Sequence, residues 1–355
     1  MHELTFKDQL LHHPESLPMT QTVKVSFPDR SLTVHYLREA YVLGSGYVRQ
    51  SCYPDSRNLH AGDGGLLTAN LEVFPESYLR QDHIASLPEK YFKYCKCTGQ
   101  LILKQTPEPS KRLLGTYYCL GNLLSHFGHF LLDGLPYLWY LLQLPESYRH
   151  TLKYLYLGNG IPEWGWDLLI PLGIQPHKVI RSVSCARVNA LIVPSASYET
   201  HIASHSAFQA VLDVIRTYHA KDIQPTRKLY LSRRQQPSRT LTNQLEVEQV
   251  FIQHGYQVVI PENLSLVEQI RLASSASHLA GPVGSNMYLA GFQHSGTTTI
   301  ILKPQHYSLP DDRLLAEQGH RHCIELEGSP LDRETYLPGQ WRYPVTPQLY
   351  SLLST

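Results

Sequence analysis

The sequence lacks an excess of charge of either sign and lacks long apolar runs. Its 355 residues include 31 basic and 30 acidic ones, a formal net charge of +1. Neither a nucleic-acid-binding surface nor an acidic tail is therefore indicated at the level of the whole chain. The most apolar stretch, 130–144, is interrupted by Asp133, Gly134 and Pro136, and it is shorter than the roughly 20 residues that a membrane-spanning helix requires. Nucleic-acid binding and a transmembrane segment are not expected.

Cysteines at metal-site spacing are also lacking. The six cysteines are dispersed except for Cys95 and Cys97, and no second pair follows at the spacing of a zinc site. We expect reduced thiols and no metal. The first 16 residues hold Glu3 and no basic segment followed by an apolar block, so no secretory signal is indicated and a cytoplasmic protein is expected.

With 42% hydrophobic residues, the chain can bury a sizeable core, and its length suggests about two domains of the α/β class. The first is expected over 1–219, with a mixed β extension over 1–100. Beyond this extension, strands alternate with helices, which predicts a parallel sheet covered on both faces. The expected strands are 101–105, 113–121, 152–158, 177–180 and 189–195, and the expected helices are 126–142, 164–172 and 205–219.

The second half has the clearer pattern, in which four strands are joined by three short crossovers. This is typical of a Rossmann-like domain, expected here over 220–330 and followed by a tail, 331–355, that can pack back on the first domain. Two such halves place a ligand cleft between them. The expected strands are 227–234, 256–262, 278–283 and 297–304, and the expected helices are 244–255, 265–275 and 287–293.

Three loops of this second domain follow parallel strands and should open at one sheet edge. The first holds Ser232, Arg233, Arg234 and Arg239. Guanidinium groups stay charged at any working pH and grip a diphosphate through paired N–H groups. A solvated basic loop is the ordinary explanation for such a run when it is taken alone.

The second loop carries Pro261 and Glu262, which are placed to border a base or a ribose. The ordinary explanation for the residues that follow is a helix start, since Ser265 and Glu268 have the spacing of a capping box.

The third loop is the turn Gly-Pro-Val-Gly-Ser-Asn over 281–286. It leads into a helix, whose first N–H groups and dipole favour an anion. A glycine turn alone is weak evidence. Convergence with the arginine loop at one sheet edge, however, describes a nucleotide-diphosphate site.

The order of these residues resembles the signature segment of glycosyltransferase family 61. The run from KLYLSRR at 228 to GPVGSNM at 287 carries the Ser-Arg-Arg, Gln269 and Gly-x-x-Gly-Ser elements in sequence, and the resemblance extends over roughly 120–305. It implies a GT-B architecture with two Rossmann-like domains, a UDP-sugar donor and inverting transfer without a required metal or other cofactor. The donor-binding residues that it implies are Ser232, Arg233, Arg234, Arg239, Pro261, Glu262, Gln269, Gly281, Gly284, Ser285 and Asn286.

The family includes bacterial proteins of capsule and surface-polysaccharide clusters. The resemblance thus implies an oligosaccharide or polysaccharide acceptor in capsule or lipopolysaccharide biosynthesis. Peripheral association with the cytoplasmic face of the inner membrane stays open, although no basic amphipathic anchor is visible. The chain departs from the family at Val283, where His is frequent, and at Gln244, where Glu is frequent, so its donor or acceptor preference can differ.

The segment HFGHFLLDGLP at 126–136 resembles the family's motif of His followed by Asp-x-Leu-Pro. His129 and Asp133 share a face if this segment is helical. Inverting transfer needs one general base. Either His129 oriented by Asp133 or Asp133 acting directly suits this task. Asn122 and His126 are candidate acceptor contacts.

Ordinary explanations also exist for this segment. Asp133 and Gly134 can end a helix before Pro136, and local hydrogen bonds can satisfy the histidines. A zinc site would need a third firm ligand, which the sequence does not offer.

Two other functions fit part of this pattern. A nucleotide-sugar 2-epimerase shares the two-domain fold and the UDP-sugar but needs no acceptor, and a non-catalytic nucleotide- or glycan-binding module would bind a ligand and form no product. Incubation with UDP-N-acetylglucosamine alone distinguishes these functions from a transferase.

Overall fold

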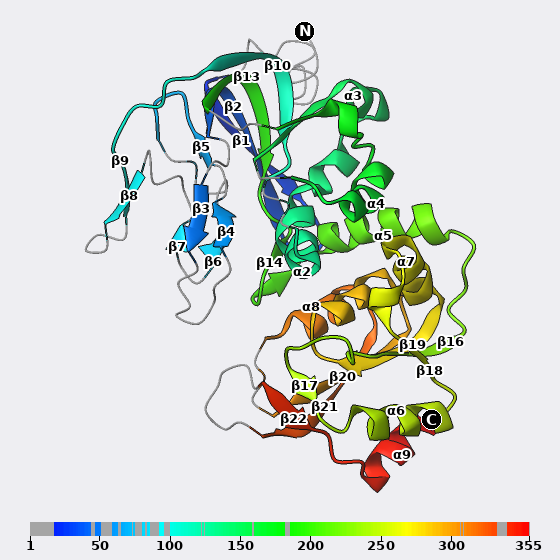
Figure 1. Ribbon diagram of the computed structural model, residues 1–355. Coiled ribbons are helices and arrows are strands. Elements are labelled where there is room, and N and C mark those ends of the chain that lie inside the picture. Colours follow the sequence, from blue (N-terminus) through cyan, green and yellow to red (C-terminus); the bar gives the residue numbers. More distant parts are fainter. Residues whose placement is uncertain are drawn as a thin grey trace. The chain divides into compact units, whose positions relative to one another are not determined.

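The computed structural model divides the chain into two units, Met1–Tyr198 and Glu199–Thr355 (Figure 1). The residues that it describes are 18–43, 47–50, 59–62, 65–72, 74, 80–81, 84–85, 92–95, 100–121, 123, 125–157, 160–181, 185–305, 307, 309–331 and 339–354.

The division lies before the helix α5 (Ser206–Ala220), which the sequence analysis assigned to the first domain. This helix buries Phe208, Val211 and Ile215 and packs against α7, α8 and η10 of the second unit. Its buried apolar face is the reason that it belongs to the second unit rather than to the first.

The first unit contains a mixed sheet with the order β1-β2-β13-β10-β11-β12, in which β5 also pairs with β2. The strands from β10 onward are parallel to one another, as predicted. However, β2 pairs antiparallel with both β1 and β13, so part of the expected β extension belongs to this sheet. The side chains of Cys119 and Cys185 are buried on it. The strands are β1 (Thr20–Ser26), β2 (Ser31–Leu43), β5 (Gly65–Leu67), β10 (Lys111–Cys119), β11 (Lys153–Tyr156), β12 (Val179–Arg181) and β13 (Cys185–Pro194).

The described part of the chain also contains short two-stranded pairs. They are β3 (Tyr47–Gln50) with β4 (Leu59–Gly62), β6 (Arg80–Gln81) with β7 (Ile84–Ala85), β8 (Phe92–Cys95) with β9 (Gln100–Leu103), and β14 (Tyr198–Glu199) with β15 (Ala203–Ser204).

The single helix expected over 126–142 is wrong. One turn of α-helix there is followed by a π-helical segment and then by two 3₁₀ segments. Pro136 has no N–H to donate to the preceding turn, and its ring does not fit a continuous helix interior. The segments of this unit are α2 (Phe127–His129), η3 (Phe130–Gly134), η4 (Leu135–Tyr137), η5 (Trp139–Gln143), α3 (Glu146–Thr151), η6 (Glu163–Gly165), α4 (Trp166–Leu169), η7 (Ile170–Leu172) and η8 (Pro176–Lys178).

The second unit is built on the parallel strands β18-β16-β19-β20-β21, extended at one edge by β22 and β17. In chain order the parallel strands lie as 2-1-3-4-5, so the connections change direction between β16 and β19. Open α/β sheets bind ligands outside the carboxyl ends of the strands at such a switch point. The strands are β16 (Arg227–Leu231), β17 (Thr240–Leu241), β18 (Gln257–Val259), β19 (Ala276–Pro282), β20 (Thr298–Pro304), β21 (His322–Pro330) and β22 (Gln340–Arg342).

Helices cover both faces of this second sheet (Figure 1). On one face, Phe251 of α6 and Leu349 and Leu353 of α9 join a buried cluster with Tyr230 and Trp341. The described part of the C-terminal tail therefore packs within the second unit. The other face is covered by α5, α7, η10 and α8. The remaining bounds are α6 (Gln244–Gln253), η9 (Pro261–Asn263), α7 (Leu266–Ser275), η10 (Ser285–Phe292), α8 (Asp311–Gln318) and α9 (Pro347–Leu353).

Candidate functional site

His129 and Asp133 form a hydrogen-bonded pair in the first unit. Nδ1 of His129 lies 2.7 Å from Oδ2 of Asp133. The Asp133 side chain is only 10% exposed, whereas that of His129 is 36% exposed. Because a carboxylate only accepts hydrogen bonds, the Nδ1–H of the imidazole donates and Nε2 becomes the basic nitrogen. This is the geometry of a general base oriented by a carboxylate.

The pair lies where the helix changes from α-helical to π-helical geometry. Asp133 lies in the π-helical segment η3. Such segments are rare overall, and those that occur frequently lie at functional sites. Phe130 of this segment is buried and packs against Trp164, with ring centroids 5.0 Å apart. Gly165 leaves room for that contact, since a Cβ there would lie 2.8 Å from the Phe130 ring.

His126 and Asn122 were the residues expected to contact the acceptor. The His126 ring lies 5.1 Å from the His129 ring, centroid to centroid. Asn122 lies outside the described residues.

In the second unit, Arg233 joins the two loops at the switch point. Its side chain comes from the loop after β16 and is 6% exposed. Nη1 donates to Oδ1 of Asn286 over 3.0 Å, in the turn after β19, and Nη2 donates to the carbonyl of Ser238 over 3.2 Å. The arginine loop and the glycine turn therefore meet, as predicted, through Arg233 and Asn286.

Gly284 is required by this contact. Its φ of +145° is rarely adopted by L side chains, and a Cβ would lie 2.1 Å from Nη1 of Arg233. Gly281 is also confined, because a Cβ there would lie 2.8 Å from the carbonyl oxygen of Leu231. The glycines therefore let the β19 turn approach the arginine loop. After them η10 begins at Ser285 as a 3₁₀ helix rather than as the expected helix from 287.

Several buried polar atoms at this edge have no hydrogen-bond partner within the described part of the chain. They are Nε of Arg233, Nε of Arg239 and Nδ2 of Asn286, all donors. A buried unpaired donor costs about 1–3 kcal/mol, and such a group calls for a functional or structural reason. Three donors on neighbouring loops suit an anion.

Ser232 and Arg234 belong to a second small network. The buried hydroxyl of Ser232 accepts from Nε2 of Gln244 over 2.9 Å and from Nε of Arg234 over 3.3 Å. Glu248, also buried, accepts from Gln244 over 3.0 Å and lies 3.3 Å from Nε of Arg234. The Arg234 side chain nevertheless stays 43% exposed. An amide at 244 can donate to Glu248, whereas a carboxylate there would repel it, which accounts physically for this departure from the family pattern.

The other departure, Val283, is buried in the second unit, and its N–H donates to the carbonyl of Leu302 over 2.8 Å. Its side chain therefore contributes to the core.

The loop after β18 is held largely by structural contacts. Ser265 and Glu268 form the predicted capping box at the start of α7. Nε2 of Gln269 donates to the carbonyls of Pro261 and Leu264, both over 3.0 Å, so its amide fixes the shape of this loop. Glu262 accepts from Nε2 of Gln236 in the arginine loop over 2.6 Å, which ties the two loops together.

A fourth loop at the same edge was missed by the sequence analysis. It follows β20, the neighbour of β19, contains Tyr307 and leads into α8, which begins with Asp311 and Asp312. Both carboxyl groups are buried, Asp311 at 1% and Asp312 at 4% exposed. The available signal was a pair of acids a short loop after the predicted strand 297–304, at the carboxyl edge that the other three loops share.

Electrostatic interactions link this loop to Arg233. Burial lowers the pKa of Arg233 to about 10, and the charge of Arg239 acts in the same direction. Glu262, Tyr307 and Asp312 oppose this fall in the pKa of Arg233. Together with its bond to Asn286, these effects place Arg233 among groups from all four loops.

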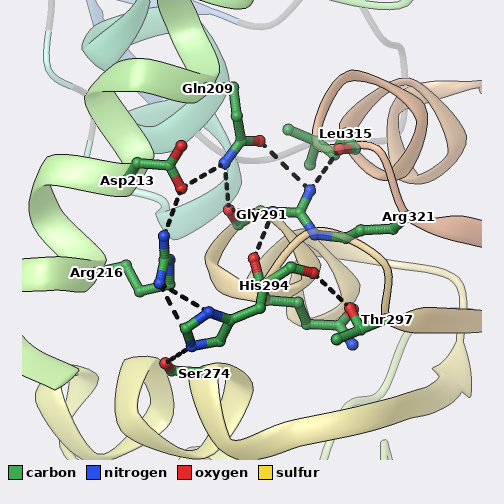
Figure 2. Close-up of polar contacts among 10 residues, drawn as sticks. Gln209, Asp213, Arg216, Ser274, Gly291, His294, Thr297, Leu315 and Arg321 are labelled. Atoms are coloured by element: carbon green, nitrogen blue, oxygen red, sulfur yellow. Dashed lines mark hydrogen bonds and ion pairs between the residues drawn. The ribbon is translucent and has the colours of Figure 1, made fainter. Parts of the chain in front are cut away.

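A buried polar network fixes η10 behind the glycine turn (Figure 2). Arg321 donates to the carbonyls of Gly291, Gln293 and Leu315 over 2.7–2.9 Å. Gln209 of α5 donates to the same Gly291 carbonyl over 3.2 Å, and His294 lies 3.1 Å from the hydroxyl of Ser274 on α7. The end of η10 is thereby anchored to three helices, which stabilises the position of its beginning.

The described ranges have neither a metal-binding group of side chains nor a membrane-spanning helix. They contain no group of three or more His, Cys, Asp or Glu side chains that could hold a metal ion. They also contain no helix that is long and apolar enough to cross a membrane.

Comparison with protein families gives one match. Residues 127–301 match the family model described as Glycosyltransferase 61. This range includes the His129–Asp133 pair, the arginine loop and the glycine turn, and it ends before Asp311 and Asp312. The curated proteins contain no significant match to the chain.

Proposed function

We propose that this chain, which belongs to glycosyltransferase family 61 through residues 127–301, transfers a sugar from a UDP-sugar to a glycan acceptor with inversion and without a metal. The observation that carries this proposal is the hydrogen bond between Arg233 and Asn286 at the switch point, which the lack of a Cβ at Gly284 permits. It gathers unpaired N–H donors from two loops where doubly wound sheets bind phosphates.

In the proposed reaction, the acceptor hydroxyl loses its proton to Nε2 of His129 as its oxygen attacks the anomeric carbon. Asp133 holds the imidazole in the required tautomer and stabilises the imidazolium that forms. The bond from the anomeric carbon to the diphosphate oxygen breaks in the same step. Arg233, Arg234 and the start of η10 stabilise the negative charge that develops on the departing UDP.

This mechanism uses one unit for the base and the other for the donor, as GT-B enzymes do. That arrangement is part of the proposal. The resemblance to family members from capsule clusters supports a capsule or lipopolysaccharide acceptor and an enzyme acting in the cytoplasm, where activated sugars are made.

A thermal-shift screen against nucleotide sugars tests the proposal. A ligand present at 100 times its dissociation constant stabilises the folded state by about 2.7 kcal/mol. We expect UDP and at least one UDP-sugar to raise the unfolding temperature, and the Asn286→Ala variant to lose this shift. An epimer formed from the UDP-sugar without any acceptor would contradict a transferase and favour an epimerase, and donor binding without transfer to any glycan would favour a binding module.

A further inference from the structure

Two adjacent carboxyl groups at the start of α8 differ in their hydrogen bonding. Asp311 uses both oxygens on His201: Oδ1 accepts from the backbone N–H over 2.9 Å, and Oδ2 lies 2.5 Å from Nδ1. This pair fastens the turn at 201, where φ is +65°, to α8. Oδ1 of Asp312, in contrast, has no hydrogen-bond partner among the residues that the structure describes. Asp311 is therefore an anchor, whereas the role of Asp312 is not explained by packing.

The topology places Asp312 beside the diphosphate-binding groups. It follows β20, which pairs with β19, which in turn pairs with β16. Its helix α8 packs against η10, the helix that starts at the glycine turn. Among the described residues, an unpaired acceptor at the start of α8 and the unpaired donors of Arg233, Arg239 and Asn286 thus all follow neighbouring strands of one sheet. Opposite charges in such surroundings attract more strongly than in water.

The groups that act on Asp312 come from every element around it. Burial raises its pKa to about 8, and the charge of Asp311 on the same helix adds to the rise. Glu325 of β21 acts in the same direction, whereas Arg239 and Arg233 oppose it. Four other titratable groups lie nearby. His201 is hydrogen-bonded to Asp311. The pKa values of Tyr288 and Tyr307 are raised by burial and further by Asp312, and burial raises the pKa of Cys323 on β21 to about 12.

We propose that Asp312 is a positioning residue for the donor site, which binds the diphosphate when Asp312 carries a proton and is blocked when Asp312 is ionised. This proposal rests on the proposed function. The ionised carboxylate would compete with the diphosphate oxygens for Arg233 and Arg239. The protonated form leaves both guanidinium groups to the ligand, and the proton comes from solvent. Donor binding at alkaline pH is therefore coupled to the uptake of one proton.

The test is the affinity for UDP, measured by calorimetry on the full chain from about pH 7 to about pH 9. Across this range the terminal phosphate of UDP is already ionised, since its second pKa is about 6. We expect the wild-type affinity to fall by up to about tenfold per pH unit above about pH 8. In the Asp312→Asn variant, which cannot ionise at this position, the affinity should stay constant over the whole range.

Asp311→Asn is the matched control, because it removes the neighbouring buried carboxyl and leaves Asp312. It should keep the fall in affinity but move its midpoint to lower pH, since one negative charge beside Asp312 is lost. A second measurement needs only the wild type: above about pH 8, the heat of UDP binding should depend on the ionisation enthalpy of the buffer, in the direction of proton uptake.

The possible outcomes separate this inference from the proposed function. The role of Asp312 is overturned if the wild type binds UDP equally well at both ends of the pH range, or if the affinity of Asp312→Asn falls with pH as that of the wild type does. Either result leaves the proposed glycosyltransferase function unaffected. A wild type that binds UDP at no pH overturns the UDP-sugar donor, and the role of Asp312 falls with it.

Discussion

Arg233 and Asn286 are 53 positions apart in the chain, and their side chains meet across 3.0 Å at the switch point between β16 and β19. Arg233 is held there by burial and by two carbonyl acceptors, so it is already oriented before any ligand arrives. Preorganised donors of this kind lower the cost of stabilising charge during a reaction. The neighbouring Arg234 is far more exposed, so the two arginines should respond differently to substitution.

Arg234→Ala should reduce turnover about 10²-fold to 10³-fold, the typical effect of removing one donor from a charge-stabilising set. Its effect on stability should be small, because the side chain is 43% exposed and Glu248 keeps its hydrogen bond from Gln244. Steady-state kinetics and thermal unfolding of the same preparation measure both quantities. Arg342→Ala, which removes an exposed arginine paired with Glu246 over 3.2 Å, is the control and should change neither. Near-normal turnover of Arg234→Ala would show that the diphosphate lies elsewhere.

His129→Ala and Asp133→Asn should abolish transfer while leaving UDP binding intact, because both residues lie in the first unit and the proposed donor groups lie in the second. Asp133→Asn preserves shape but can donate to Nδ1, which reverses the tautomer, and such a change has reduced turnover by about 10⁴-fold in hydrolases that use a carboxylate-oriented histidine. Calorimetry with UDP and a transfer assay with the screened donor measure the two effects. Loss of folding together with binding would instead assign the pair a structural role.

Gly284→Ala should weaken both the fold and UDP binding, since its Cβ would lie 2.1 Å from Nη1 of Arg233 and φ is +145°. Gly296→Ala is the matched control: φ is +77°, and nothing lies within 4 Å of the added Cβ, so only backbone strain is introduced, about 1 kcal/mol. Urea unfolding should show a clearly larger loss for Gly284→Ala, and calorimetry should show at least about tenfold weaker UDP binding. Equal behaviour of the two variants would mean that Arg233 can move aside without consequence.

The sequence was sufficient to predict the main alternating strands and helices from β16 to β20, because each strand is a short apolar run and each loop after it has polar residues at the carboxyl end. The capping box of Ser265 and Glu268 could be predicted from spacing alone. The strand order could not, since the position of β16 between β18 and β19 depends on contacts between distant segments. The switch point thus became visible only in the structure.

Asp312 was missed for a different reason. Acids in the first turn of a helix are common because they interact favourably with the helix dipole, so Asp311 and Asp312 are explained by local structure when only the sequence is known. Their burial depends on η10 and β21 packing over the start of α8. Likewise, the pattern of 126–142 favours a helix with a possible end before Pro136, and only the structure shows that Asp133 lies in a π-helical segment.

The pH dependence of folding provides a measurement on Asp312 that needs no ligand. Its pKa is raised from 3.8 to about 8 in the folded protein, chiefly by burial, whereas in the unfolded chain it returns to about 3.9. Between these values the folded state holds a proton that the unfolded state has released, so this group makes the protein less stable as pH rises, by at most about 1.4 kcal/mol per unit. Above about pH 8 both states have released the proton, and the loss of stability from Asp312 is complete.

Asp312→Asn removes this contribution, so the free energy of unfolding of the variant relative to the wild type should increase steadily from about pH 5 to about pH 8 and then level off. Urea denaturation at successive pH values measures it. Asp311→Asn retains the Asp312 carboxyl and should retain part of the slope, ending at a lower pH because the neighbouring charge is gone. A constant difference between Asp312→Asn and the wild type would mean that the Asp312 carboxyl is ionised in the folded protein throughout this range, and that its unpaired oxygen is satisfied by water.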